Sequence, residues 1–250
     1  MRKFYQTEWH GIPLESVAAV SSSRLAGASF YSSFYDAFFK KYSKPEELDQ
    51  SWVELKKQTA GFLKQNSKCK KESRILSIGC GLGIMEKTLI NEGLSNIEVT
   101  EISSEPLRWL LPYIQNEHVH IGSFPSCFPD DKIYDFIYLS SVDYFFDKEE
   151  LIDFLKKVKE RLSPEGVCLL ISWSFESSRT VRRVLGYVKN LTMFVLEKVS
   201  IRKRGQFWGY LRNRRDYQSA MEASGFVKVH DGFLEKKTRW ETYWIEGSKN

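Results

Sequence analysis

The alternation of apolar and polar residues is most informative between residues 74 and 89, R-I-L-S-I-G-C-G-L-G-I-M-E-K-T-L. An apolar run of strand length breaks at Gly79, Gly81 and Gly83 and then resumes with the periodicity of a helix. Closely spaced glycines after a buried strand let the backbone turn sharply and approach a ligand, and the following helix offers it free N–H groups. This segment therefore predicts a ligand-binding strand, turn and helix.

Other segments predict further strands alternating with helices. Residues 97–103, I-E-V-T-E-I-S, alternate as a strand does and place Glu101 near its end. From residue 208 onward the pattern predicts an amphipathic helix that stops at Gly225 and is followed by a strand, and residues 240–246 predict a final hairpin strand. Strands that alternate with helices indicate an α/β fold.

The first 66 residues show mainly helical periodicity. Residues 45–64 have the chemistry of a helix start, with Pro45 and two acids in the first turn, and before them aromatic side chains recur at helical intervals: Phe30, Phe34, Tyr35 and Phe38. We expect residues 1–66 to form an N-terminal helical cap and residues 67–250 to form the main domain. Apolar residues three or four apart predict a helical lid inserted near residues 176–206.

Composition narrows the class of protein. With 250 residues, of which 42% are hydrophobic, the chain is long enough for one α/β domain with additions. Four cysteines without C-x-x-C or Cys/His ligand spacing predict reduced thiols in a cytoplasmic protein. No stretch reaches the roughly 20 apolar residues that span a bilayer, and no clustered His/Asp set predicts a metal site.

The net charge of +5 is unevenly distributed, because arginines and lysines gather between residues 179 and 215. Such a basic segment favours an anionic acceptor or contact with an anionic membrane surface. The alternative is a solvated face of a long helix. Aromatic residues within the segment also leave an RNA-binding interpretation open.

The glycine spacing distinguishes between cofactors. A dinucleotide fingerprint would place its third glycine, or an alanine, at Ile84, so NAD and FAD are disfavoured. The spacing G-x-G-x-G resembles motif I of the class I S-adenosylmethionine (SAM) dependent methyltransferases, and residues 134–146, Y-D-F-I-Y-L-S-S-V-D-Y-F-F, resemble motif IV of that family. The resemblance implies a three-layer, Rossmann-like, seven-stranded sheet that is mostly parallel and ends in an antiparallel hairpin strand.

The resemblance also implies SAM as cofactor, S-adenosylhomocysteine (SAH) as product, and a set of residues that contact them. Glu101 would accept hydrogen bonds from the ribose, and Tyr35 of the cap would close over the cofactor. Two positions depart from the family: Ser77 replaces an acid that helps hold the methionine amine, and Ser123 replaces an adenine-contacting aspartate. The cofactor residues implied are Ser77, Gly79, Cys80, Gly81, Gly83, Glu101, Ile102, Ser123, Phe124, Ser140 and Tyr35.

The resemblance places the residues after the motif IV strand beside the reactive methyl. We therefore expect Asp143 to act as base or substrate anchor, with Tyr144 beside it, and His10 to reach the cleft if the cap folds over it. The predicted function is SAM-dependent O-methylation of a small molecule or glycan. The alternatives are an RNA-directed methyltransferase and a non-catalytic SAM-binding regulator or scaffold. Nucleic acid is disfavoured, because L-S-S-V-D-Y lacks the N/D-P-P-Y/F tetrapeptide of base N-methyltransferases.

Overall fold

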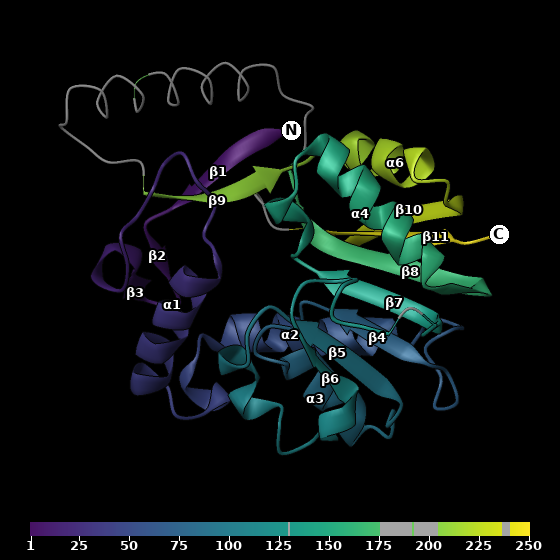
Figure 1. Ribbon diagram of the computed structural model, residues 1–250, viewed down its shortest axis with the longest axis horizontal. Coiled ribbons are helices and arrows are strands. Elements are labelled where there is room, and N and C mark those ends of the chain that lie inside the picture. Colours follow the sequence, from purple (N-terminus) through teal and green to yellow (C-terminus); the bar gives the residue numbers. More distant parts are fainter. Residues whose placement is uncertain (130, 176–191, 193–204, 237–240) are drawn as a thin grey trace.

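A seven-stranded sheet forms the centre of the protein, as the computed structural model shows for residues 1–129, 131–175, 192, 205–236 and 241–250 (Figure 1). The strand order is β10-β11-β8-β7-β4-β5-β6; β11 runs antiparallel to both of its neighbours, and the other neighbouring strands are parallel. This confirms the predicted mostly parallel sheet with an antiparallel C-terminal hairpin. The strands are β4 (Ile75–Ile78), β5 (Ile97–Glu101), β6 (Val119–Ile121), β7 (Tyr134–Ser140), β8 (Leu162–Ser174), β10 (Val227–Lys236) and β11 (Glu241–Ser248).

Helices cover both faces of the sheet. On one face α2 (Gln50–Leu63) and α3 (Ile84–Asn91) pack in an apolar cluster with β4 and β5. On the other face α4 (Lys148–Glu160) and α6 (Arg214–Ala223) pack together over β7 and β8. The amphipathic pattern explains this arrangement, since the apolar residues of α4 that fall one helical turn apart are the buried ones. The result is the predicted three-layer architecture.

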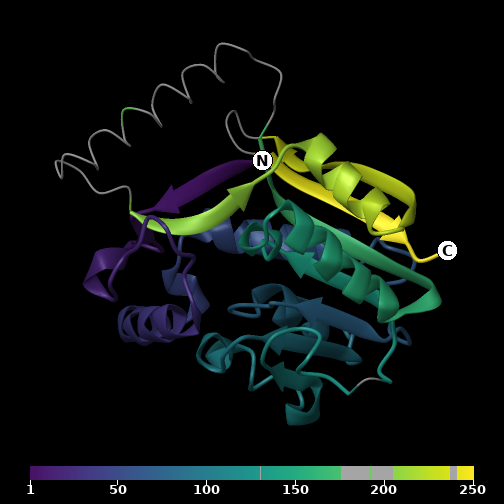
Figure 2. The same cartoon turned by 45° about the horizontal axis from the view of Figure 1, so that its top comes forward.

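A smaller structure stands beside the sheet. Strand β1 (Arg2–Gln6) pairs antiparallel with β9 (Gln206–Leu211), so the N-terminal strand and a segment about 200 residues later form one ribbon, which Figures 1 and 2 show next to α1 (Ala28–Lys41). A short hairpin of β2 (Glu8–Trp9) and β3 (Ile12–Pro13) follows β1. Buried aromatic rings of α1 join this hairpin and Trp208 of β9 in a separate apolar cluster. The cap is therefore built from both strands and helices.

Three expectations about these elements need correction. The predicted helix from residue 208 begins only at Arg214, after the N-cap Asn213, because the aromatic segment before it pairs with β1 as a strand. The first residues of the cap form strands, and its first α-helix begins at Ala28. The second helix begins after Asp49, whose carboxylate accepts from two backbone N–H groups, so residues 45–47 form only a 3-10 turn.

The division into residues 1–66 and 67–250 remains a prediction. Most of the expected lid, residues 176–191 and 193–204, lies outside the described residues.

In the part of the chain that the structure describes, no helix is both long enough and apolar enough to cross a membrane. Within those same ranges, no three His, Cys, Asp or Glu side chains gather as metal ligands would.

Candidate active site

The glycine turn after β4 is shaped by backbone torsions that favour glycine. Gly79, Gly81 and Gly83 have φ angles of +67°, +57° and +67°. A Cβ on Gly79 would lie 2.6 Å from the Val142 side chain, and one on Gly83 would lie 2.6 Å from Leu110. A Cβ on Gly81 would meet nothing within 4 Å. Two of the glycines are thus needed for packing, whereas the middle one borders open space.

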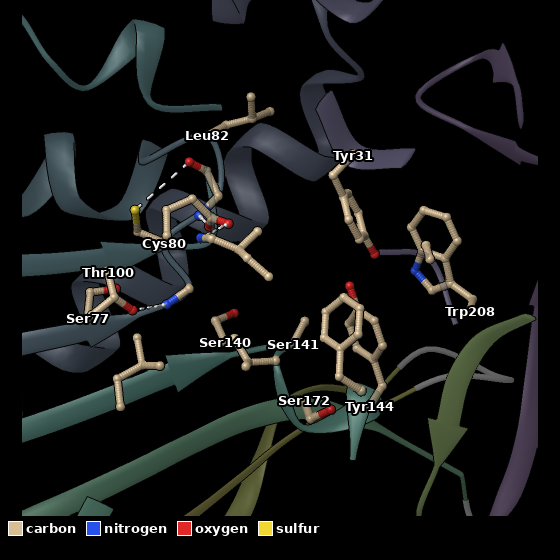
Figure 3. Close-up of a pocket in the computed structure, with 18 of the residues that line it drawn as sticks. Tyr31, Ser77, Cys80, Leu82, Thr100, Ser140, Ser141, Tyr144, Ser172 and Trp208 are labelled. Atoms are coloured by element: carbon tan, nitrogen blue, oxygen red, sulfur yellow. Dashed lines mark hydrogen bonds between the residues drawn. The ribbon is translucent and has the colours of Figure 1, made fainter. Parts of the chain in front are cut away.

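That space is a cavity of about 450 Å³ between the sheet and the cap. Its volume lies within the range of small-molecule sites in proteins. The glycine turn forms one side, and Figure 3 shows Tyr31, Tyr144 and Trp208 facing it across the cavity. The carboxyl ends of β4, β5 and β7 meet at this edge of the sheet, which is where open α/β sheets bind ligands.

Glu101, at the end of β5, is fixed by backbone N–H groups. Its Oε2 accepts from the Gly81 N–H at 2.8 Å, and its Oε1 accepts from the Ile102 N–H at 2.9 Å. Burial raises the pKa of this carboxyl above its usual value, and the two N–H bonds oppose that shift. Thr100 Oγ1 accepts from the Gly79 N–H at 3.1 Å, so β5 also holds the start of the turn (Figure 3).

The turn after β6 closes another side of the cavity. The Gly122 N–H donates to the Glu101 carbonyl at 2.9 Å, which brings Ser123 and Phe124 to the cavity wall. The Phe124 ring packs edge-on against Phe154 of α4, with ring centroids 5.7 Å apart. The structure thus brings together at one cavity all of the residues predicted for the cofactor: Ser77, Gly79, Cys80, Gly81, Gly83, Glu101, Ile102, Ser123, Phe124, Ser140 and Tyr35.

Among the predicted catalytic residues, Tyr144 and His10 line the cavity and Asp143 does not. Asp143 is fully buried, its Oδ2 accepts from the Tyr217 hydroxyl at 2.7 Å, and Arg212 lies 3.5 Å away. Burial raises the pKa of its carboxyl, and the neighbouring guanidinium lowers it. We therefore correct the expectation that Asp143 meets an acceptor: its side chain is enclosed by the protein behind the cavity wall.

Arg212, the ion-pair partner of this buried carboxylate, also positions the turn that follows β7. Its guanidinium donates to the carbonyls of Asp143 at 2.8 Å and Asp147 at 2.9 Å, and also to the carbonyl of Phe146. These bonds fix the 3-10 turn Asp143–Phe145, which carries Tyr144 to the cavity. The turn also packs tightly on β9, because a Cβ on Gly209 would lie 2.1 Å from the Tyr144 carbonyl oxygen.

His10 follows the strand β2, with a left-handed φ of +48°. Its ring packs edge-on against Trp52 and Phe38, with ring centroids 4.8 Å and 5.5 Å apart. Its Nε2 is buried and has no hydrogen-bond partner among the described residues. Burial, with a smaller contribution from the positive charge of Lys56, lowers the pKa of His10 to about 4. The imidazole is therefore neutral at pH 7 and its ring borders the cavity.

Several cavity residues escaped the sequence analysis. Trp52 and Lys56 of α2 lie one helical turn apart on the same face, and that i, i+4 spacing is the signal that could have found them. The sequence pattern predicts a helix at Trp208, and it therefore does not indicate that this side chain, which lies in β9, lines the cavity. Tyr31 lies on the same face of α1 as Tyr35, and burial raises the pKa of both hydroxyls, which therefore stay protonated.

Known proteins resemble this chain in sequence and in fold. An uncharacterized methyltransferase from Staphylococcus carnosus is 27% identical over 146 residues, which are 58% of this chain and 67% of that protein. N-terminal Xaa-Pro-Lys N-methyltransferase 1-B from Xenopus laevis is 26% identical over 114 residues, which are 44% of this chain. The latter match spans only about half of the relative, 51% of its length.

Among solved structures, the magnesium protoporphyrin IX methyltransferase of Synechocystis PCC 6803, crystallised with bound SAH, superposes with a TM-score of 0.60 at 13% identity. The superposition covers 88% of this chain and 96% of that one. The methyltransferase domain family matches residues 51–231, which is more than half of the chain and includes most of the cavity. The cofactor is accordingly SAM, and the chain belongs to the methyltransferase domain family of SAM-dependent enzymes.

Proposed function

We propose that the protein transfers a methyl group from SAM to a hydroxyl oxygen of a small molecule or a glycan unit. The observation that carries this proposal is the cavity in which the glycine turn faces a wall of aromatic side chains. Aromatic faces stack well on flat or apolar rings, including sugar rings and aromatic metabolites. An enclosed site also keeps water away from the reactive methyl.

At the cofactor end, Glu101 is the partner for the ribose hydroxyls, since each of its oxygens makes only one backbone hydrogen bond and keeps a further lone pair. Gly81 borders open space that the cofactor can fill, since a Cβ there would meet nothing within 4 Å. Ser123 and Phe124 border the space for the adenine. When bound, SAM supplies a methyl group already activated by its positive sulfur.

At the acceptor end, His10 is our candidate for the proton acceptor. When the acceptor oxygen bonds to the methyl carbon, the S–CH3 bond of SAM would break to leave SAH, and the O–H proton of the acceptor would pass to the neutral imidazole of His10. The position of His10 at the cavity wall and its low pKa support this role, because a protonated imidazole could not accept. Tyr31 and Tyr144, whose hydroxyls point toward one another in Figure 3, would orient the acceptor against Trp208.

An acceptor screen with methyl-labelled SAM tests the proposal. The panel contains phenols, sugars, small carboxylic acids, amines, a peptide with a free N-terminus and RNA. We expect label on a hydroxyl compound, and a His10→Asn variant that loses about 10²–10⁴-fold in kcat. His118→Asn, a matched change outside the cavity, should keep full activity. Label found only on RNA or on the peptide amine would overturn the proposal.

Two finer expectations also belong to this proposal. An anionic acceptor is supported by the basic residues between 179 and 215, most of which lie outside the described residues. A cytoplasmic location is supported by the four cysteines, all of which are free thiols. Carboxylated compounds in the acceptor panel, and fractionation of the cells that make the protein, test these two points separately.

A further inference from the structure

Ser77 stands where the family carries an acid, but its hydroxyl contacts the carboxylate of Glu86. The Ser77 hydroxyl donates to Glu86 Oε1 at 2.7 Å, and the Tyr138 hydroxyl donates to the same oxygen at 2.8 Å. Glu86 is fully buried, and its Oε2 has no hydrogen-bond partner among the described residues. Because the hydroxyl hydrogen of Ser77 is donated to Glu86, Ser77 can act toward a ligand only as an acceptor, and it lines the cavity.

Lys56 brings the opposite charge to the same region. It reaches the cavity from α2, and its Nζ donates to Ser140 Oγ at 3.1 Å and lies 5.6 Å from the centre of the Trp52 ring. Burial lowers the pKa of the Lys56 ammonium, and the negative charge of Glu86 opposes that shift. Lys56 is partly buried. A charge withdrawn from water is costly unless it is paired, and none of the ion pairs of the described residues joins Lys56 to a carboxylate.

Lys56 and Glu86 contact residues at the ends of two neighbouring strands, since Lys56 donates to Ser140 of β7 and Glu86 accepts from Ser77 of β4. Ser77 of β4 pairs in register with Tyr138 of β7, and Ser140 is the last residue of β7. In Figure 3, Ser77 lies on the side of the glycine turn, Ser140 lies near the middle of the cavity, and Tyr31 and Trp208 stand opposite. A ligand that fits between Lys56 and Ser77 should therefore carry both a negative and a positive group close together.

We propose that Lys56 and the Glu86–Ser77 pair hold the zwitterionic methionine end of SAM. Lys56 donates to the carboxylate of the cofactor, and Ser77 accepts from its ammonium while Glu86 supplies the negative charge behind it. The acid missing at position 77 is thus replaced by one on α3, nine residues further along the chain. This inference rests on SAM as the methyl donor of the proposed function and adds to it how the amino-acid end is recognised.

Calorimetric binding of three ligands to the full-length protein tests the proposal. SAH carries the whole methionine end, decarboxylated SAH lacks the carboxylate, and 5′-methylthioadenosine lacks both charged groups. For Lys56→Met we expect SAH to bind about tenfold or more weakly, whereas the other two ligands lose less than about twofold. Lys57→Met, the exposed neighbour on α2, is the matched control and should change none of the three.

The carboxylate behind Ser77 is tested by Glu86→Gln, which keeps the shape of the side chain. We expect this variant to weaken binding of SAH and decarboxylated SAH, which both carry the ammonium, and to leave 5′-methylthioadenosine unchanged. Thermal unfolding will show whether Glu86→Gln disturbs folding. If it does, Ser77→Ala should still weaken binding of SAH and decarboxylated SAH and leave 5′-methylthioadenosine unchanged.

The outcomes separate this inference from the proposed function. Equal losses for all three ligands would assign Lys56 and Glu86 a purely structural role and overturn the proposal. Unchanged SAH binding in Lys56→Met would also overturn it and would leave Lys56 to an anionic acceptor. Failure of the unsubstituted protein to bind any of the ligands would contradict SAM binding itself, and with it both proposals.

Discussion

The buried imidazole of His10 should make the stability of the protein depend on pH in a defined window. The folded protein holds its pKa at about 4, against 6.5 for the unperturbed group. Because the folded pKa lies below the unfolded one, the unfolded chain binds the proton first as the pH falls. The free energy of unfolding that depends on neutral His10 is therefore fully present above about pH 6.5 and is lost as the pH falls toward 4.

The magnitude follows from the shift. At about 1.36 kcal/mol per pKa unit, proton linkage through His10 removes about 2 kcal/mol between pH 7 and pH 5. His10→Asn removes this titration while keeping a residue that tolerates the left-handed φ of +48°. Urea unfolding at pH 7 and at pH 5, followed by tryptophan fluorescence, should show a steeper loss for the unsubstituted protein than for the variant.

His118→Asn is the control for this experiment, because it removes one histidine from outside the cavity. It should retain the steep loss of the unsubstituted protein. If His10→Asn and the unsubstituted protein lost the same free energy between pH 7 and pH 5, His10 would titrate normally. A normally titrating His10 would not be the neutral, buried proton acceptor proposed for the acceptor end of the cavity.

Two further predictions concern the framework of the site. Arg212→Met leaves the buried Asp143 carboxylate without its ion-pair partner and two carbonyls without their donor, so chemical unfolding should show a loss of about 3–5 kcal/mol. The exposed Arg215→Met should lose little, and equal small losses would refute the role of Arg212. Gly79→Ala and Gly81→Ala both place a side chain at positive φ, but only the former meets Val142. Thermal unfolding should show the larger loss for Gly79→Ala, and equal losses would contradict the packing described.

The parts of the fold that sequence analysis predicted are those encoded by nearby residues. The buried strand, glycine turn and helix lie within a few residues of each other, and both the turn geometry and the cavity position of the implied cofactor residues agree with the structure. The strand at residues 206–211 was missed because its partner is β1, about 200 residues earlier, and tertiary pairing overrides local helical periodicity.

The acceptor side of the site depended on contacts distant in sequence. Asp143 follows the motif IV strand as expected, but Arg212 and Tyr217, roughly 70 residues later, enclose its carboxylate. Likewise, the sequence shows that an acid is missing at Ser77, but only the folded helix α3 reveals that Glu86 stands behind it. Periodicity along one segment cannot predict such contacts between segments.

The central claim is that the cavity at the glycine turn binds SAM through Glu101. Calorimetric titration with SAH tests it most directly, with Glu101→Ala as the variant and the exposed Glu54→Ala as the matched control. Loss of two hydrogen bonds to a charged acceptor should weaken binding about 100-fold in Glu101→Ala and leave Glu54→Ala unchanged. Equal SAH affinity in Glu101→Ala and the unsubstituted protein would contradict the account, because the cofactor would then bind elsewhere.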